Sequence, residues 1–211
     1  MDKTMSDVRK VGFLLFEGFE LLDVFGPAEI FGVLEKFYSV DLLAIQAGPV
    51  KSAQGPEVVA AKALAVPSEL DILLVPGGIG TRREAENPEF LDHLSTAAGR
   101  IELVGSICTG SGLLAAAGLL DGFSATTNKL SFQWVEGQSD RVAWRKSARW
   151  VEDGKYWTSS GVTAGMDMAF AIVAKQHGRE LAKRVADAIE YEWHEDAGWD
   201  PFSELYEWTR E

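Results

Sequence analysis

The stretch IELVGSICTGSGLLAAAG, residues 101–118, contains an apolar run, a turn of small residues and an Ala/Leu-rich segment in direct succession. The apolar run, 101–107, has the length and composition of a strand that is buried on both faces. The small residues after it permit a sharp bend into a helix that ends at or just after Gly118. A buried strand that leads directly into a helix is typical of proteins built around a parallel sheet. This segment therefore predicts an α/β fold.

The same alternation continues on both sides of this segment. The other apolar runs predict strands or hairpins at 11–16, 40–45, 50–61, 71–75, 124–127 and 150–159. Apolar residues at helical spacing predict helices that begin at Pro27 and that cover 88–98, 130–137, 163–177 and 179–190. The pattern predicts one α/β domain with a largely parallel sheet.

The length of 211 residues is that of a single domain. We expect this domain to cover 11–190, with a polar N-terminal tail at 1–10 and an acidic, Trp-rich C-terminal tail at 191–211. No apolar run reaches the roughly 18 residues of a membrane span. The run 11–16 is also too short for the core of a signal peptide. We therefore expect neither a membrane partner nor a targeting segment.

Charge and cysteine usage narrow the possible function classes. The formal net charge of −12 argues against nucleic-acid binding, because that affinity comes mainly from cationic contacts to phosphates. The single cysteine excludes an intramolecular disulfide and a cysteine-cluster zinc site, and an unpaired thiol suits the reducing cytoplasm. The three histidines are far apart in the sequence, so we expect no metal site.

Cys108 is the strongest candidate for chemistry, because it lies where the strand 101–107 meets the following helix. A nucleophile on such a turn projects from the end of the sheet. The free N–H groups and the dipole at the start of the helix favour the thiolate. We therefore expect a pKa below the value of about 8.5 for free cysteine. The alternative is a small buried cysteine with a structural role.

Gly77 and Gly78 are expected at the same edge of the sheet, because they directly follow the strand 71–75. Ligand sites of α/β proteins lie at the carboxyl ends of the strands. The backbone N–H groups of Gly78 and Thr109 would form an oxyanion hole there. The alternative is a tight turn that requires a positive φ.

Asp23 is an acid inside the apolar stretch LLDVF, residues 21–25. Burial of the carboxyl group would raise its pKa and make it a proton donor near neutral pH. The alternative is a capping residue for the helix that begins at Pro27. Glu17 and Glu20 are rival acids in the same loop, and we expect both to be exposed.

The remaining candidates have simpler interpretations. We expect His93, His177 and His194 to be structural or exposed, although the tail that holds His194 could fold back over a pocket. Asp167 is expected to cap a helix or to pair with a cation. The stretch IGTR, 79–82, lacks the lysine of a phosphate-binding loop. One apolar stripe predicts either a dimer interface or packing on the protein's own sheet: Ile30, Phe31, Leu34 and Phe37.

Taken together, these residues resemble the ThiJ/PfpI superfamily over residues 11–176. The resemblance rests on residues 11–23 and on the motifs VPGG (75–78), SICTGS (106–111) and SATT (124–127). The combination of LDVFGP (22–27), ICTG (107–110) and GVTAGMD (161–167) is most similar to the isonitrile hydratase branch.

The resemblance implies a flavodoxin-like three-layer sandwich with a mostly parallel central sheet, a homodimer and no cofactor. It also implies that Cys108 is the nucleophile and that Asp23 is the acid that hydrogen-bonds it. This sequence departs from the pattern at Asn128, where many relatives carry a histidine. Asparagine cannot shuttle a proton at neutral pH, which argues against chemistry that needs a cysteine–histidine pair.

Three functions use this set of residues. The first is hydration of an isonitrile to an N-substituted formamide, a small-molecule reaction that needs one nucleophile and one acid but no histidine. The second is a redox-responsive protein that senses stress through oxidation of Cys108. The third is glyoxalase-like conversion of small α-oxoaldehydes. The sequence leaves all three open, because they share Cys108 and Asp23.

Overall fold

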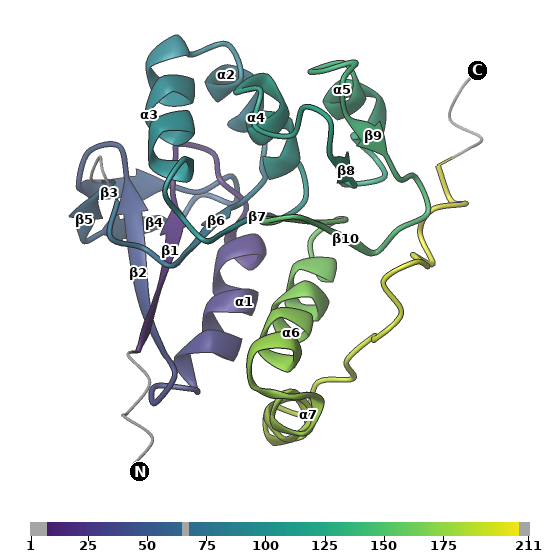
Figure 1. Ribbon diagram of the computed structural model, residues 1–211. Helices are drawn as coiled ribbons and strands as arrows, with labels where there is room; N and C mark the ends of the chain where they lie inside the picture. Colours follow the sequence, from purple (N-terminus) through teal and green to yellow (C-terminus); the bar gives the residue numbers. More distant parts are fainter. Residues whose placement is uncertain (1–7, 65–67, 207–211) are drawn as a thin grey trace.

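The computed structural model describes residues 8–64 and 68–206. Its centre is a seven-stranded sheet with the strand order β10–β11–β7–β6–β1–β2–β5 (Figure 1). All neighbouring strands are parallel except β10 and β11. The bounds are β1 (Arg9–Leu14), β2 (Tyr38–Ala44), β5 (Lys62–Ala63), β6 (Ile72–Val75), β7 (Leu103–Ser106), β10 (Trp150–Asp153) and β11 (Tyr156–Ser159).

Helices cover both faces of this sheet (Figure 1). One face carries α1 (Leu21–Gly32) and α6 (Ala164–His177), with α7 (Arg179–Ala188) packed against α6. The other face carries α2 (Thr81–Glu84), α3 (Pro88–Ala98) and α4 (Gly110–Ala116). The sequence prediction of a three-layer α/β fold with a mostly parallel sheet is therefore confirmed.

Smaller elements lie outside the central sheet. The predicted hairpin at 50–61 forms β3 (Gly48–Lys51) and β4 (Glu57–Ala60), and the short strand at 124–127 forms β8 (Ser124–Ala125). β8 pairs with β9 (Ala143–Trp144), which the sequence pattern did not indicate. α5 (Phe132–Glu136) lies between β8 and β9 in the chain. Such short segments contain too few residues to establish a period.

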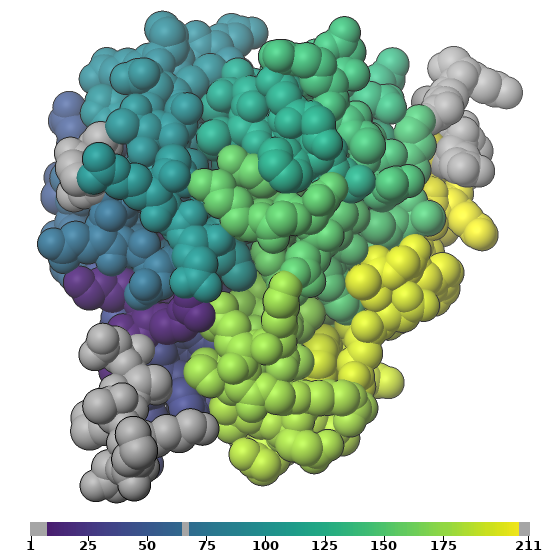
Figure 2. Space-filling model, in the orientation of Figure 1, coloured from purple at the N-terminus to yellow at the C-terminus, as the bar shows by residue number. Residues whose placement is uncertain are grey.

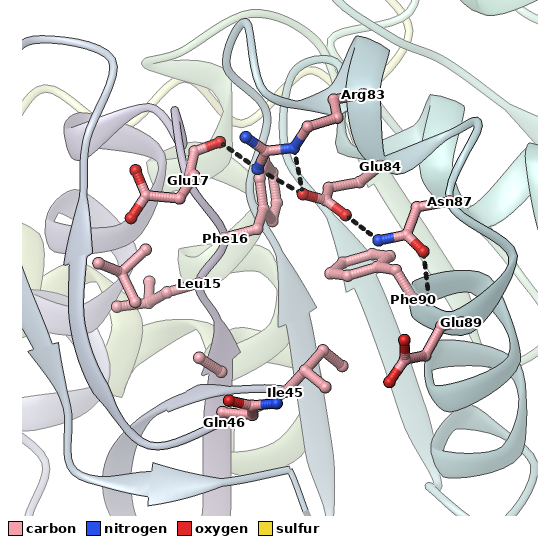
Figure 3. A pocket seen from close by; sticks show the side chains of 12 residues that line it. Leu15, Phe16, Glu17, Ile45, Gln46, Arg83, Glu84, Asn87, Glu89 and Phe90 are labelled. Atoms are coloured by element: carbon pink, nitrogen blue, oxygen red, sulfur yellow. Dashed lines mark hydrogen bonds and ion pairs between the residues drawn. The ribbon is translucent and has the colours of Figure 1, made fainter.

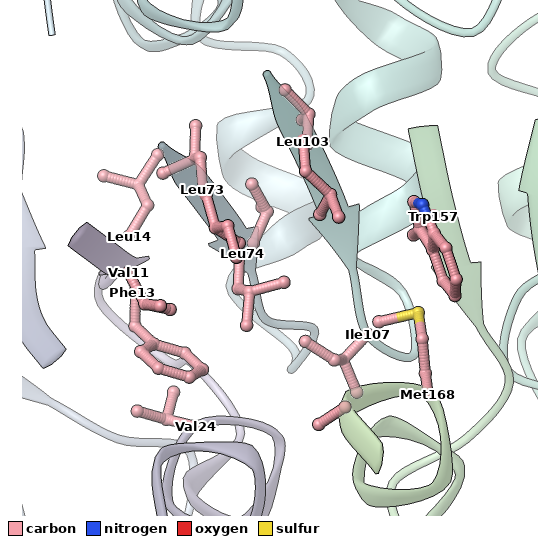
Figure 4. Packing of buried hydrophobic residues seen from close by; sticks show 14 of the residues in the cluster. Val11, Phe13, Leu14, Val24, Leu73, Leu74, Leu103, Ile107, Trp157 and Met168 are labelled. Atoms are coloured by element: carbon pink, nitrogen blue, oxygen red, sulfur yellow. The ribbon is translucent and has the colours of Figure 1, made fainter. Parts of the chain in front are cut away.

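The hydrophobic core lies between the sheet and its two helical layers. Every residue of β6 and β7 is buried, as expected for parallel strands that are covered on both faces. Figure 4 shows Phe13 of β1 directed toward Val24 of α1, and Ile107 beside Met168 of α6. These core contacts therefore hold α1 and α6 against the sheet near the carboxyl ends of β1 and β7.

The start of α1 differs from the sequence prediction. The helix begins at Leu21, so Pro27 lies inside it and Asp23 lies in its first turn. Proline at position 27 removes only one helical hydrogen bond, the one to the Asp23 carbonyl. Tertiary packing buries both residues, so the helix tolerates this loss. The predicted stripe also packs inward, because Ile30, Phe31 and Leu34 belong to the core. The stripe therefore gives no reason to expect a dimer.

The described part of the C-terminal segment, residues 191–206, lies along the surface beside α6 and α7 (Figures 1 and 2). Tyr191 and Trp193 pack on Phe170 of α6, with ring centroids 5.7 Å away in each case. At the other end of the chain, β1 takes in Arg9 and Lys10, which the sequence assigned to the N-terminal tail. The rest of the predicted tails, 1–7 and 207–211, lies outside the described residues. Within the described ranges, no helix has the length and apolar character needed to cross a bilayer.

Candidate active site

Cys108 lies in the turn between β7 and α4, with φ of 55°. A positive φ is uncommon for a residue other than glycine, and such strain persists only where the surroundings enforce it. Here the Cys108 N–H donates to the Ser160 carbonyl (3.1 Å), and the Thr127 hydroxyl donates to the Cys108 carbonyl (2.9 Å). The side chain is 7% exposed. The fold therefore holds the thiol rigidly at the carboxyl edge of the sheet.

Asp23 is completely buried in the first turn of α1. Its Oδ2 accepts a hydrogen bond from the Gly77 N–H (2.8 Å), so the side chain does not cap its own helix. Its Oδ1 is also buried and has no hydrogen-bond partner among the described residues. An unpartnered carboxyl oxygen in the protein interior is costly unless a ligand or a reacting group uses it.

Gly77 brings these two groups together. A Cβ atom added at Gly77 would lie 2.6 Å from the Thr109 N and 2.9 Å from the Cys108 Cβ, so this backbone packs directly on the cysteine turn. Its N–H group meanwhile binds Asp23. Only glycine permits this approach. The thiol and the acid, 85 positions apart in the sequence, therefore lie on either side of one glycine.

Gly78 does not lie as the sequence analysis expected. Its N–H donates to the Thr109 Oγ1 (3.1 Å), so this group is not free to form half of an oxyanion hole. The N–H groups of Thr109 and Val162 instead act on the Cys108 sulfur, where both lower the pKa of the thiol. Val162 lies two residues before α6, inside the GVTAGMD motif, but the sequence analysis did not assign its N–H group to the site.

Burial controls the protonation of both groups. It raises the pKa of Asp23 well above its ordinary value, against the lowering effect of the Gly77 N–H. Burial is also the largest cause that raises the pKa of the Cys108 thiol, and the charge of Asp23 raises it further. The expectation of a thiolate below the free-cysteine pKa is therefore wrong for this structure. Desolvation raises the pKa of Cys108 by more than the N–H groups at the start of α4 lower it.

Alkylation of Cys108 by iodoacetamide should report this raised pKa. We expect the rate to keep increasing as the pH rises past about 8.5, the pKa of free cysteine, because the reactive thiolate is still a minority there. The measurement is the alkylation rate between pH 6 and 10, with Cys108→Ser as the blank. A plateau below pH 7 would contradict the dominance of burial.

The other candidates have hydrogen-bond or ring contacts of their own. Glu17 accepts the Lys51 N–H (3.1 Å), and Glu20 accepts the Gln54 amide (2.7 Å). Asn128 accepts the Ser131 N–H (3.0 Å). The histidine rings have other contacts: His93 with the Glu89 carbonyl, His177 with Phe37 and Tyr38, and His194 with Trp199.

Asp167 neither caps a helix nor lies on the surface. It is completely buried, and its carboxylate accepts two hydrogen bonds or ion-pair contacts from Arg149, at 2.7 and 2.8 Å. It also accepts from the Tyr191 hydroxyl (3.1 Å) and the His194 N–H (2.9 Å). This carboxylate therefore ties the C-terminal segment to the domain.

A cavity of about 280 Å³ lies at the carboxyl ends of β1 and β2 beside α3 (Figure 3). Its floor is apolar, and its buried acid, Glu84, has both oxygens occupied by Arg83 (2.8 Å) and Asn87 (2.8 Å). No cysteine, serine, threonine, lysine or histidine is among the described residues that line it. We therefore place the chemistry at Cys108. Within 8–64 and 68–206, no three His, Cys, Asp or Glu side chains are grouped so as to hold a metal ion.

Comparison with known proteins agrees with this geometry. The DJ-1/PfpI family matches residues 9–175. The isonitrile hydratase of Pseudomonas putida is 33% identical over 182 residues, which cover 86% of this chain and 78% of that protein. The HTH-type transcriptional regulator GbdR of Pseudomonas aeruginosa is 28% identical over 189 residues, which cover 87% of this chain but 51% of the regulator.

A solved structure leads to the same assignment. The crystal structure of a ThiJ/PfpI family protein from Pseudomonas syringae superposes with a TM-score of 0.77 at 29% identity, over 91% of this chain and 81% of that one. The family match spans most of the chain and includes the cysteine turn, Asp23 and the glycine pair. The chain therefore belongs to the DJ-1/PfpI family.

Proposed function

We propose that this protein hydrates an isonitrile to an N-substituted formamide, with Cys108 as the nucleophile and Asp23 as the acid. The observation that carries the proposal is the unpartnered Oδ1 of a buried acid beside the only thiol of the chain. The similarity to an isonitrile hydratase supports it. The narrow access to Cys108, which is 7% exposed, also suits the reaction. An isonitrile reacts through the terminal carbon of a slender, linear group.

In the first step, the Cys108 sulfur bonds to the terminal carbon of the isonitrile. The raised pKa of Asp23 keeps a proton on its carboxyl group, and this proton moves to the same carbon as the sulfur attacks. The thiol proton replaces it on the carboxyl group. The product of this step is a thioimidate, and Asp23 ends the step as protonated as it began.

In the second step, water adds across the C=N bond of the thioimidate. Its oxygen bonds to the carbon, and a proton goes to the nitrogen. The C–S bond then breaks, which releases the formamide and returns the thiol. The N–H groups of Thr109 and Val162 face the sulfur, so they stabilise the negative charge that the sulfur gains as it leaves.

A substrate panel tests this proposal. We expect wild-type protein to convert cyclohexyl isonitrile to its formamide, detected by NMR, and Cys108→Ala to show only the uncatalysed rate, because the covalent route is lost. Thermal unfolding would verify that the variant is folded. Methylglyoxal forms the second arm. Its consumption without isonitrile turnover would favour the glyoxalase-like function, and inertness toward both would favour the redox role of Cys108.

We also propose a homodimer, on different residues from those that the sequence indicated. Leu22 and Phe25 of α1, and Val33 directly after its end, are 41%, 44% and 48% exposed, and helical spacing places them on one side. Exposed apolar residues that gather on one helix face favour association with a second copy.

Light scattering tests the dimer. We expect wild-type protein to give twice the mass of 23.0 kDa, and Phe25→Asp to give 23.0 kDa. Leu205→Asp, at a similarly exposed leucine, should leave the dimer intact. A wild-type particle of 23.0 kDa would refute the dimer.

A further inference from the structure

Arg82 is a charged residue near Cys108 that the proposed chemistry does not use. It lies in α2, and its side chain is held in place from three directions. Its Nη1 donates to the Thr81 Oγ1 (3.1 Å), its Nη2 donates to the Ser131 Oγ (2.9 Å), and its guanidinium carbon lies 4.1 Å above the centre of the Trp134 ring. The guanidinium is therefore fixed in one orientation before any ligand binds.

Both hydroxyls that fix Arg82 belong to segments that contact the cysteine turn. The Thr81 Oγ1 lies 3.2 Å from the Oγ1 of Thr109, the residue after Cys108. On the other side, Ser131 follows the segment whose Thr127 hydroxyl binds the Cys108 carbonyl. The electrostatic effect agrees with this placement, since a thiolate at Cys108 would raise the pKa of Arg82 against the lowering effect of burial.

This guanidinium has no carboxylate partner among residues 8–64 and 68–206. Its neighbour Arg83, in contrast, is paired with Glu84. Cys108 is not an anionic partner for Arg82 before substrate binds, because burial raises the pKa of the thiol and keeps it protonated. A half-buried cation that is rigidly held without a counter-ion is the arrangement that proteins use to bind an anionic ligand group.

The surroundings indicate which kind of anion fits. Ile79 and Leu130 are 67% and 70% exposed, and they lie three positions before Arg82 and next to Ser131, respectively. The half-buried Trp134 ring packs on the guanidinium itself, so a ligand at Arg82 meets an apolar surface as well as a cation. The planar guanidinium matches a carboxylate, which it binds through two parallel N–H groups.

We propose that Arg82 binds a carboxylate on the substrate, so that the preferred substrates are isonitriles that carry a carboxyl group on an apolar body. This inference rests on the proposed isonitrile hydration for the identity of the reacting group. The carboxylate site itself does not depend on it. Arg82 acts by binding and orienting the substrate, and Cys108 and Asp23 keep their roles.

The first test compares ω-isocyano carboxylates of increasing chain length with their methyl esters. We expect wild-type protein to prefer the acid at the best chain length. In Arg82→Gln, the ratio of kcat/KM for acid to ester should fall by about 10- to 150-fold, the range for a lost hydrogen bond to a charged group. Arg83→Gln is the matched control and should keep the wild-type ratio. An unchanged ratio in Arg82→Gln would overturn the proposal.

The second test needs no isonitrile turnover. Iodoacetate and iodoacetamide both alkylate Cys108, the one cysteine of the chain, and differ in carrying a carboxylate or a neutral amide. We expect the iodoacetate-to-iodoacetamide rate ratio to fall about tenfold in Arg82→Gln and to stay constant in Arg83→Gln. A fall in this ratio without any isonitrile hydration would overturn the proposed function and leave the carboxylate site standing. An unchanged ratio would overturn the site itself.

Discussion

Replacing Asp23 with asparagine should slow the chemical step of isonitrile hydration by about 10²–10⁴-fold, the usual contribution of a positioned general acid. The amide has the shape of the carboxyl group, and its oxygen can still accept the Gly77 N–H. It cannot give a proton to the isonitrile carbon. Because the residue is buried and its one hydrogen bond is retained, the thermal midpoint should stay close to that of the wild type.

Single-turnover kinetics would measure this loss, with Glu20→Gln as the matched control. Glu20 is the neighbouring acid, and its charge also raises the pKa of Asp23 and Cys108, but it is less buried and its carboxylate binds Gln54. We expect the control to retain activity within a few-fold. At a pH high enough to ionise Asp23, Asp23→Asn should also lower the pKa of Cys108 and speed its alkylation, because it removes a negative charge beside the thiol. An active Asp23→Asn enzyme would exclude the carboxyl group as the acid.

Replacing Asp167 with alanine should destabilise the protein by about 3–5 kcal/mol, because it leaves a buried guanidinium without its main partner. The Arg149 side chain is 6% exposed, and its other carboxylate neighbour, Asp200, is 3.6 Å away. The hydrogen bonds from Tyr191 and His194 are lost at the same time. Denaturant unfolding measures the change in the free energy of unfolding, and proteolysis would show whether the segment after α7 is released first.

Two further variants serve as controls for this prediction. Asp187→Ala removes an exposed carboxylate that pairs with Lys183 on α7, and exposed pairs of this kind contribute about 0.3–0.5 kcal/mol. The double variant Asp167→Ala/Arg149→Met removes both buried charges, so it should be more stable than Asp167→Ala alone. A loss of less than about 1 kcal/mol in Asp167→Ala would mean that water reaches Arg149 and replaces the carboxylate.

The sequence by itself determined the α/β fold class, most strands of the central sheet and the position of the nucleophile in the chain. Strands buried on both faces are continuous apolar runs, so β6, β7 and most of β1 could be recognised from composition alone. α3 matched its prediction at both ends, because Pro88 stands at its first turn and the Asn87 side chain caps it. These features depend on residues close together in the chain, and local patterns record them.

Only the tertiary structure decided which side chains of the site lie together and how burial shifts their pKa values. Asp23 and Gly77 are 54 positions apart, and their contact depends on how the first turn of α1 packs against the turn that follows β6. The same packing reversed the expected shift in the pKa of Cys108, because desolvation depends on every neighbour of the sulfur and not on the helix that follows it. It also buried Asp167 and, within the described part of the chain, left Arg82 without a carboxylate partner. Burial and long-range electrostatics are set by atoms that the fold brings together from distant parts of the chain, and no local pattern encodes them.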